Sequence, residues 1–97
     1  MATPKQVTHG AYDQAPDDMN YMSVARFDEG ITWGKGRTPR ESVLRVKREL
    51  QSDGRRHIIR EMKTFLVHKG TYLNRGGSLV SPSPEAAEAL REIKIKE

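Results

Sequence analysis

The side chains of this chain best suited to chemistry are its lysines and arginines. Twelve of the seventeen lie within residues 35–75, beside four acidic residues, so this segment has a net charge of +8. The flanks are weakly acidic, with net charges of −3 over residues 1–34 and −1 over residues 76–97. Guanidinium groups hold phosphates through paired hydrogen bonds, and arginine outnumbers lysine in this segment. The pattern predicts binding to a polyanion such as RNA.

Ten basic side chains are predicted to contact RNA phosphates. They are Lys35, Arg37, Arg40, Arg45, Lys47, Arg48, Arg55, Arg56, Arg60 and Lys63. Two other interpretations stay open: an acidic protein or anionic lipid surface as the partner, or a solvated face stabilised by i, i+4 pairs of Arg45 with Glu41 and Glu49. Four acids cannot neutralise twelve bases, which favours an external anion.

Nothing in the sequence nominates a catalytic residue, a cofactor or a metal. Cysteine is absent, which excludes disulfides, thiolate nucleophiles and cysteine-based zinc sites. His9, His57 and His68 are predicted to be ordinary polar surface. Residues 34–37 (Gly-Lys-Gly-Arg) do not match the phosphate-binding loop of NTPases. They are read as a flexible basic loop, whose backbone amides could approach a phosphate. The sequence therefore predicts a protein that is not an enzyme.

The aromatic residues allow two interpretations. Tyr12, Tyr21, Trp33 and Tyr72 could stack on unpaired bases, or they could anchor contacts with neighbouring proteins. The second interpretation is favoured, because tyrosine and tryptophan in a chain with a small core are more often anchors of protein contacts.

The elements that position these residues are predicted to be helices. Residues 38–41 (Thr-Pro-Arg-Glu) form a capping box with proline at the first helical position, so a helix is expected over 39–53, with Gly54 as its left-handed terminator. Apolar residues at 58, 59, 62, 65 and 66 follow a helical period and predict a second helix over 55–69. The apolar faces of these two helices should pack against each other, which gives a basic helical hairpin.

The rest of the chain is expected to be less regular. Residues 1–33 are read as an extended arm for neighbouring proteins, with a short strand over 21–27. Residues 71–97 are read as a loop followed by a short helix over 84–94, started by Ser83. The predicted fold class is mainly α, in three segments (1–33, 34–70 and 71–97).

Composition limits what this chain can do alone. Hydrophobic residues make up 35% of it, which predicts a small core and ordering by docking on something larger. No apolar stretch is long enough to span a membrane. The lack of cysteine fits a reducing compartment inside the cell, either a mitochondrial or other organellar matrix or a bacterial-type cytoplasm.

Residues 38–66 resemble the S-twenty-one family of small-subunit ribosomal proteins. An acidic residue opens the first helix at Glu41, a Lys-Arg pair lies at 47–48 between apolar residues, Gly54 falls at the turn, and a basic second stretch ends near Phe65. Residues 58–60 (Ile-Ile-Arg) resemble the organellar members. The resemblance implies two basic helices packed against ribosomal RNA, and hence a structural subunit of the ribosome.

Two other functions are weighed against this one. The first is a non-catalytic accessory or assembly subunit of a large, possibly organellar, protein complex. The second is a helix-turn-helix DNA-binding protein. It is disfavoured because residues 55–61 offer mainly Arg, His and Ile instead of the Asn, Gln or Ser that read base edges.

Overall fold

The computed structural model describes residues 5–96 and shows a mainly β protein, with 46% of the residues in strands and 21% in helices. The predicted mainly-α fold is therefore wrong. The molecule measures 39 × 30 × 20 Å along its principal axes. Residues 1–4 of the predicted arm and residue 97 of the predicted C-terminal segment lie outside the described residues.

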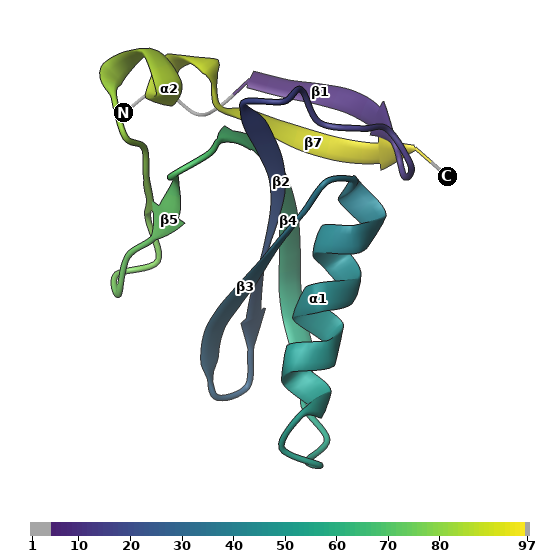
Figure 1. Cartoon of the computed structure of the whole chain (residues 1–97). Helices are drawn as coiled ribbons and strands as arrows, with labels where there is room; N and C mark the ends of the chain where they lie inside the picture. Colours follow the sequence, from purple (N-terminus) through teal and green to yellow (C-terminus); the bar gives the residue numbers. More distant parts are fainter. Residues whose placement is uncertain (1–4, 97) are drawn as a thin grey trace.

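A five-stranded mixed sheet organises the molecule (Figure 1). Its strands, in the spatial order β1-β7-β4-β2-β3, are β1 (Lys5–Gly10), β7 (Arg91–Lys96), β4 (Ile59–His68), β2 (Met19–Phe27) and β3 (Gly30–Gly36). The pairs β2–β3, β2–β4 and β4–β7 are antiparallel, whereas β1 and β7 are parallel. The first and last strands in the sequence are thus neighbours, at the edge of the sheet opposite β3.

The first predicted helix is confirmed as α1 (Pro39–Gln51). Thr38 caps it, since its hydroxyl accepts a hydrogen bond from the amide of Glu41 at 3.1 Å, and proline stands in the first turn. Gly54, shortly after the helix, has φ of 71°, a conformation that suits glycine. Residues Ser42, Val46 and Leu50 form the buried stripe of the helix.

The second predicted helix, over 55–69, does not form, so there is no helical hairpin in the described chain. Most of this segment is β4, which lies in the middle of the sheet between β7 and β2. Both faces of a central strand can be covered, so Phe65, Leu66 and Val67 are apolar in succession instead of alternating. Together with Ile58, Ile59 and Met62, this run imitates a helical period.

The C-terminal helix is shorter than predicted. Ser83 caps α2 (Pro84–Ala89) by accepting the amide of Ala86, which confirms the predicted start. The helix ends at Ala89, however, and residues 91–96 form β7. Here Ile93 and Ile95 alternate with charged residues, the period of a strand with one covered face. This alternation was visible in the sequence, but residues 91–94 were assigned to the predicted helix.

The predicted arm is also largely β. The short strand expected over 21–27 is confirmed within β2, and β1 and β3 lie on either side of it in the sequence. Residues 34–36, read as a flexible loop, are the end of β3.

The two faces of the sheet are covered differently. Helix α1 packs on one face, where Ala25, Val46 and Leu50 form a buried cluster. On the same face, the buried hydroxyl of Ser23 is hydrogen-bonded to Ser42 of α1 and to Thr64 of β4, each at 2.7 Å. The opposite face carries a small hairpin of β5 (Tyr72–Leu73) and β6 (Leu79–Val80), which encloses a cavity of about 160 Å³ with Val24 and Phe65, among other residues.

Candidate nucleic-acid interface

Two glycines let α1 lie directly on the edge strand β3. A Cβ atom on Gly34 would lie 2.8 Å from Cβ of Arg45, and one on Gly36 would lie 2.6 Å from the amide nitrogen of Ser42. Both distances are shorter than real Cβ contacts, so a larger residue at either position would push the helix away. The glycines that seemed to mark a loop thus provide a close contact between helix and strand.

This close contact brings cations from two elements to one rim of the molecule. Trp33 and Lys35 of β3 line a shallow depression of about 540 Å³ together with Arg45, Arg48 and Glu49 of α1. We call these five residues the α1–β3 rim. Its charge balance is three cations to one carboxylate. Trp33 and Lys35 pair with Val24 and Met22, so they border the rim from the face of the sheet away from α1.

Trp33 and Lys35 contact each other within the rim. The Lys35 ammonium lies 5.8 Å from the centroid of the Trp33 ring, within the range of a cation–π interaction. Trp33 keeps 39% of its surface exposed. Partial burial lowers the pKa of Lys35, because desolvation disfavours the charged ammonium. An anion placed beside Lys35 would restore the stabilisation that water no longer provides.

The cationic surface continues along α1 beyond the rim. Arg40, Arg45 and Arg48 line a neighbouring depression over the outer side of the helix. The Arg40 guanidinium lies 5.7 Å from the ring of Tyr12, which is 72% exposed. Arg40 and Tyr12 thus form a second pairing of a cation with an aromatic ring.

The helix carboxylates do not neutralise these cations. Glu41 and Glu49 lie four residues from Arg45, but neither comes within ion-pair distance of it. Within residues 5–96, ion pairs engage two of the ten predicted contact residues: Arg55 pairs with Glu29, and Lys63 lies 3.8 Å from Glu92. The predicted i, i+4 pairs thus do not account for the basic face.

Arg37 is a structural residue, although its position in the basic segment suggested a phosphate contact. Its guanidinium donates hydrogen bonds to the backbone carbonyls of Met19, Ala15 and Pro16, and to the side chain of Asn20. These bonds join the start of β2 and the segment before it to the residue that precedes the Thr38 cap, and they occupy donors that a phosphate would need.

The remaining predicted residues do not share the rim. Lys47, Arg55 and Arg56 lie around a separate depression beside the loop from α1 to β4. Arg60 sits at the irregularity in the β2–β4 register, where Phe27 opposes Ile59. Lys63 alternates with Met62 and Thr64, which face α1, and therefore lies on the opposite face of the sheet. The structure thus gathers Arg40, Arg45 and Arg48 on the outer side of α1, places Lys35 at the adjoining edge of β3, and disperses the others.

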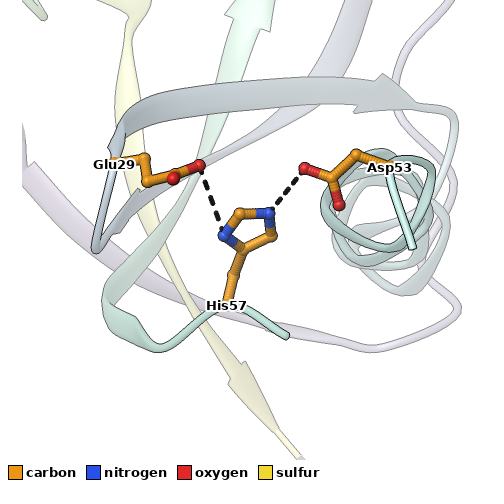
Figure 2. Close-up of side chains that lie close together, drawn as sticks. All are labelled: Glu29, Asp53 and His57. Atoms are coloured by element: carbon orange, nitrogen blue, oxygen red, sulfur yellow. Dashed lines mark hydrogen bonds and ion pairs between the residues drawn. The ribbon is translucent and has the colours of Figure 1, made fainter. Parts of the chain in front are cut away.

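A cluster that the sequence did not predict lies at the far end of α1, where His57 stands between carboxylates (Figure 2). The ring nitrogen Nε2 is 2.8 Å from Asp53, while Nδ1 is 3.1 Å from Asp28 and 3.8 Å from Glu29. The side chain is 4% exposed and packs edge-on against Phe27, with ring centroids 5.1 Å apart. The prediction of ordinary polar surface is therefore wrong for His57.

The hydrogen bonds of His57 favour its protonated form. The bond to Asp53 raises the pKa of His57 most, and the bond to Asp28 adds to this against desolvation. The backbone amide of Arg55 and then the His57 ring hold the pKa of Asp53 below its ordinary value. The i, i+4 spacing of Asp53 and His57 was visible in the sequence, but Asp28 and Glu29 come from the distant β2–β3 turn.

The same cluster meets the simplest geometric condition for a metal site, because donor atoms of Glu29, Asp53 and His57 lie within 4.8 Å of one another. Coordination needs a free lone pair on one imidazole nitrogen. Carboxylates face both ring nitrogens from opposite sides, as Figure 2 shows for Glu29 and Asp53. This arrangement favours the protonated ring. We call His57 with Asp28, Glu29 and Asp53 the His57 clasp, which joins the β2–β3 turn to the end of α1.

Comparison with known proteins does not extend this description: no family model, no curated protein and no solved structure matches the chain. Neither helix between residues 5 and 96 has the length and apolar character needed to cross a membrane.

Proposed function

We propose that this protein is a non-catalytic RNA-binding subunit of a ribonucleoprotein particle, and that it holds RNA through the α1–β3 rim and the adjoining Arg40. The observation that carries the proposal is the row of Arg40, Arg45 and Arg48 along the outer side of α1, with Lys35 at the adjoining edge of β3 and no carboxylate of residues 5–96 at ion-pair distance from these four side chains. RNA supplies the phosphates that such cations attract, and counterion release drives the association.

The proposal keeps the RNA partner expected from the charge pattern but not the helical hairpin. The resemblance to the S-twenty-one family implied two packed helices, and residues 59–68 form a strand instead. The ribosome is therefore one of several ribonucleoprotein particles to which the protein could belong. The rim is an argument for RNA binding and does not identify the particle.

The test is the salt dependence of binding to an RNA hairpin with single-stranded tails, which offers both duplex and unpaired phosphates. The logarithm of the affinity should fall linearly with the logarithm of salt concentration between roughly 50 and 200 mM, with about 0.7–0.9 of slope for each phosphate contact. Replacing Arg45 and Arg48 together by alanine should reduce the slope by about 1.4–1.8. An affinity that does not change with salt would contradict the proposal.

A matched control separates the rim from general charge. The double variant R45E/R48E and the double variant K94E/K96E change the net charge equally. Lys94 and Lys96 are exposed on β7, away from the rim. The first variant should abolish measurable binding and the second should weaken it only slightly. Equal losses in both would show that net charge, and not the rim, holds the RNA.

One observation favours a second candidate, an accessory subunit of a protein complex. Ile58 and Ile59 are adjacent in sequence and remain 65% and 39% exposed at the start of β4. An exposed apolar pair is typical of a contact with another protein. Nuclease treatment of the native particle separates the two: co-migration with a protein-only complex after RNA removal would favour the accessory role.

A further inference from the structure

Strand β4 is paired along its whole length on one side only. It pairs with β2 from Ile59 to His68, whereas its register with β7 covers residues 64–66 alone. Beyond Ile93, which lies opposite Thr64, β7 continues beside β1 and away from β4. Figure 1 shows β7 crossing the upper end of the sheet while β4 runs on downward. Among the strands of residues 5–96, none pairs with residues 59–63 on the side away from β2.

This free side of residues 59–63 is an open sheet edge. In an antiparallel ladder, about every second residue directs its N–H and C=O groups toward one neighbour, and the residues between direct theirs the other way. No loop or turn within residues 5–96 hydrogen-bonds to the backbone of residues 59–63. Four of the five side chains are exposed and Met62 is half-buried. Such an edge is a template for another strand.

Apolar side chains lie beside the open edge on the face of the sheet that carries α1. Ile59 pairs with Phe27 and Met62 with Ala25, and Phe27, Met62 and Ala25 pack together on that face. The helix lies mainly over β3 and β2, so it leaves the β4 part of the face less covered. Ile59 accordingly remains 39% exposed.

Two depressions follow the edge on this face. Ile59 borders the first, of about 350 Å³, together with Leu50 of α1. Met62 borders the second, of about 480 Å³, together with Ile93 and Ile95 of β7. Alternate side chains of a strand point to the same face. A strand laid along the edge would therefore direct every second side chain toward these depressions, and apolar side chains suit them.

Cations surround the edge. Lys47 and Arg56 line the first depression, and no carboxylate lines it. No carboxylate of residues 5–96 lies at ion-pair distance from either side chain. The edge itself adds Arg60 and Lys63 against the single carboxylate of Glu61. Acidic side chains on an added strand would find opposite charges along it.

We propose that the open edge of β4 at residues 59–63 binds an extended segment of a partner protein, which adds to the sheet as a strand and alternates apolar with acidic residues. The edge offers carbonyl oxygens as well as N–H groups, and phosphate oxygens accept hydrogen bonds but donate none, so a peptide suits it better than RNA. This surface is distinct from the arginine row of α1, and the inference does not depend on RNA binding.

The experiment uses a fluorescein-labelled peptide of about nine residues in which valine alternates with glutamate. Fluorescence anisotropy gives its affinity for the full chain. A control peptide with lysine in place of glutamate should bind at least about 10-fold more weakly, because like charges would then meet. The acidic peptide should also slow hydrogen exchange at backbone amides within residues 59–63, followed by NMR.

Methylation of peptide nitrogens tests strand addition itself. In one peptide, the methyl groups replace the N–H hydrogens of every second residue, and in another those of the residues between. The set that faces β4 should lose at least about 10-fold in affinity, and the set that faces solvent should stay within about twofold. Docking through side chains alone would leave the two sets alike.

Variants of the protein locate the site. The double variant K47E/R56E should weaken peptide binding by about 10-fold. The control K69E/R75E changes the net charge equally at exposed positions, one after the other end of β4 and one between β5 and β6, and should stay within about twofold. Ile59→Thr keeps a β-branched residue in the strand and should weaken binding by about 3- to 10-fold. Circular dichroism should show an unchanged fold in all three.

Several results would overturn the inference. One is the absence of peptide binding at concentrations up to about 1 mM. Another is equal affinity of the two methylated peptides, or equal losses in K47E/R56E and K69E/R75E. A third is a dimer of the protein alone in sedimentation, with the amides of residues 59–63 already protected, since a second copy would then cover the edge. Salt-dependent RNA binding through Arg45 and Arg48 would stand in each case.

Discussion

At the scale of single residues, His57 joins two parts of the chain that are distant in sequence. Its ring lies between Asp53 at the end of α1 and Asp28 and Glu29 in the β2–β3 turn, and Arg55 pairs with Glu29 from the same loop. Two carboxylate acceptors, one for each ring nitrogen, are satisfied together only by the doubly protonated ring. The clasp is therefore sensitive to pH.

The pH dependence of folding stability follows from the shifts in the pKa values of His57 and Asp53. The pKa of His57 is raised in the folded state, mainly by Asp53, so its stabilisation is complete below about pH 6.5 and is lost as pH rises through the folded pKa. The pKa of Asp53 is lowered, so its contribution is present above its ordinary pKa and is lost as pH falls through the folded value. We expect the clasp to stabilise the protein most in mildly acidic solution.

Urea unfolding between about pH 5 and pH 9 tests this expectation. The wild-type unfolding midpoint should decline through neutral pH relative to that of a variant with His57→Gln. The control is His68→Gln, which should keep the wild-type trend because, among residues 5–96, the carboxylate at ion-pair distance from His68 is that of the exposed Asp18, at 3.8 Å. A His57 pKa at or below its ordinary value by NMR titration would contradict the clasp.

Residue type alone did not separate binding arginines from structural ones. Arg37 and Arg45 carry the same group eight positions apart in one basic segment. The guanidinium of Arg37 donates its hydrogen bonds to backbone carbonyls, whereas Arg45 lies on the rim. The difference arises because the tertiary fold leaves several backbone carbonyls near Arg37 without a backbone partner. One guanidinium group can donate hydrogen bonds to all of them.

At the scale of elements, the packing of α1 on β3 depends on a glycine. Alanine at Gly36 would place its Cβ 2.6 Å from the Ser42 amide nitrogen and 2.9 Å from the Glu41 carbonyl carbon. These are backbone atoms, which cannot rotate away. We expect Gly36→Ala to lower the free energy of unfolding by about 1–3 kcal/mol or more, measured by denaturant unfolding.

A glycine in a turn provides the control for this substitution. A Cβ on Gly76 would meet the Asn74 side chain at an ordinary 3.5 Å, so Gly76→Ala should leave stability nearly unchanged. Gly36→Ala should also weaken RNA binding, because the displaced helix carries Arg45 and Arg48. Equal stabilities of the two variants would mean that α1 is not held against β3 as described.

The elements were predictable to different degrees. The capped starts at Thr38 and Ser83 were found because a cap is a local arrangement of four residues. The strand β4 was mistaken for a helix because its neighbours β7 and β2, which make it central, come from distant parts of the chain. Apolar residues on both faces remove the two-residue period that identifies a strand.

At the scale of the whole molecule, the sheet is completed by its last strand. Strand β7 lies between β1 and β4, and β1 pairs with no other strand among residues 5–96. Ile93 of β7 is 5% exposed and packs with Tyr21 and Met19. Loss of β7 would leave β1 unpaired and expose one of the two buried clusters.

We therefore expect a chain that stops after Leu90 to lose cooperative unfolding altogether, since the free energy of unfolding of a small domain is about 5–15 kcal/mol. The milder variant Ile93→Ala should remain folded but be less stable by about 2–5 kcal/mol. Lys96→Ala, an exposed position on the same strand, is the control. Thermal unfolding followed by circular dichroism provides the measurement, and a cooperative transition in the truncated chain would contradict this role of β7.

The sequence by itself determined the local features of this protein. It placed the basic segment over 35–75, the capped helix at Thr38 and the strand over 21–27, because charge, capping and short alternation depend on neighbouring residues.

Only the tertiary structure decided how these features combine. It turned residues 59–68 into a central strand, placed β7 between β1 and β4, and used the glycines at 34 and 36 to bring α1 onto β3. It also divided the basic residues between the rim, the interior and the opposite face. Strand pairing and burial join residues far apart in the chain, and no short window of sequence contains both partners of such a contact.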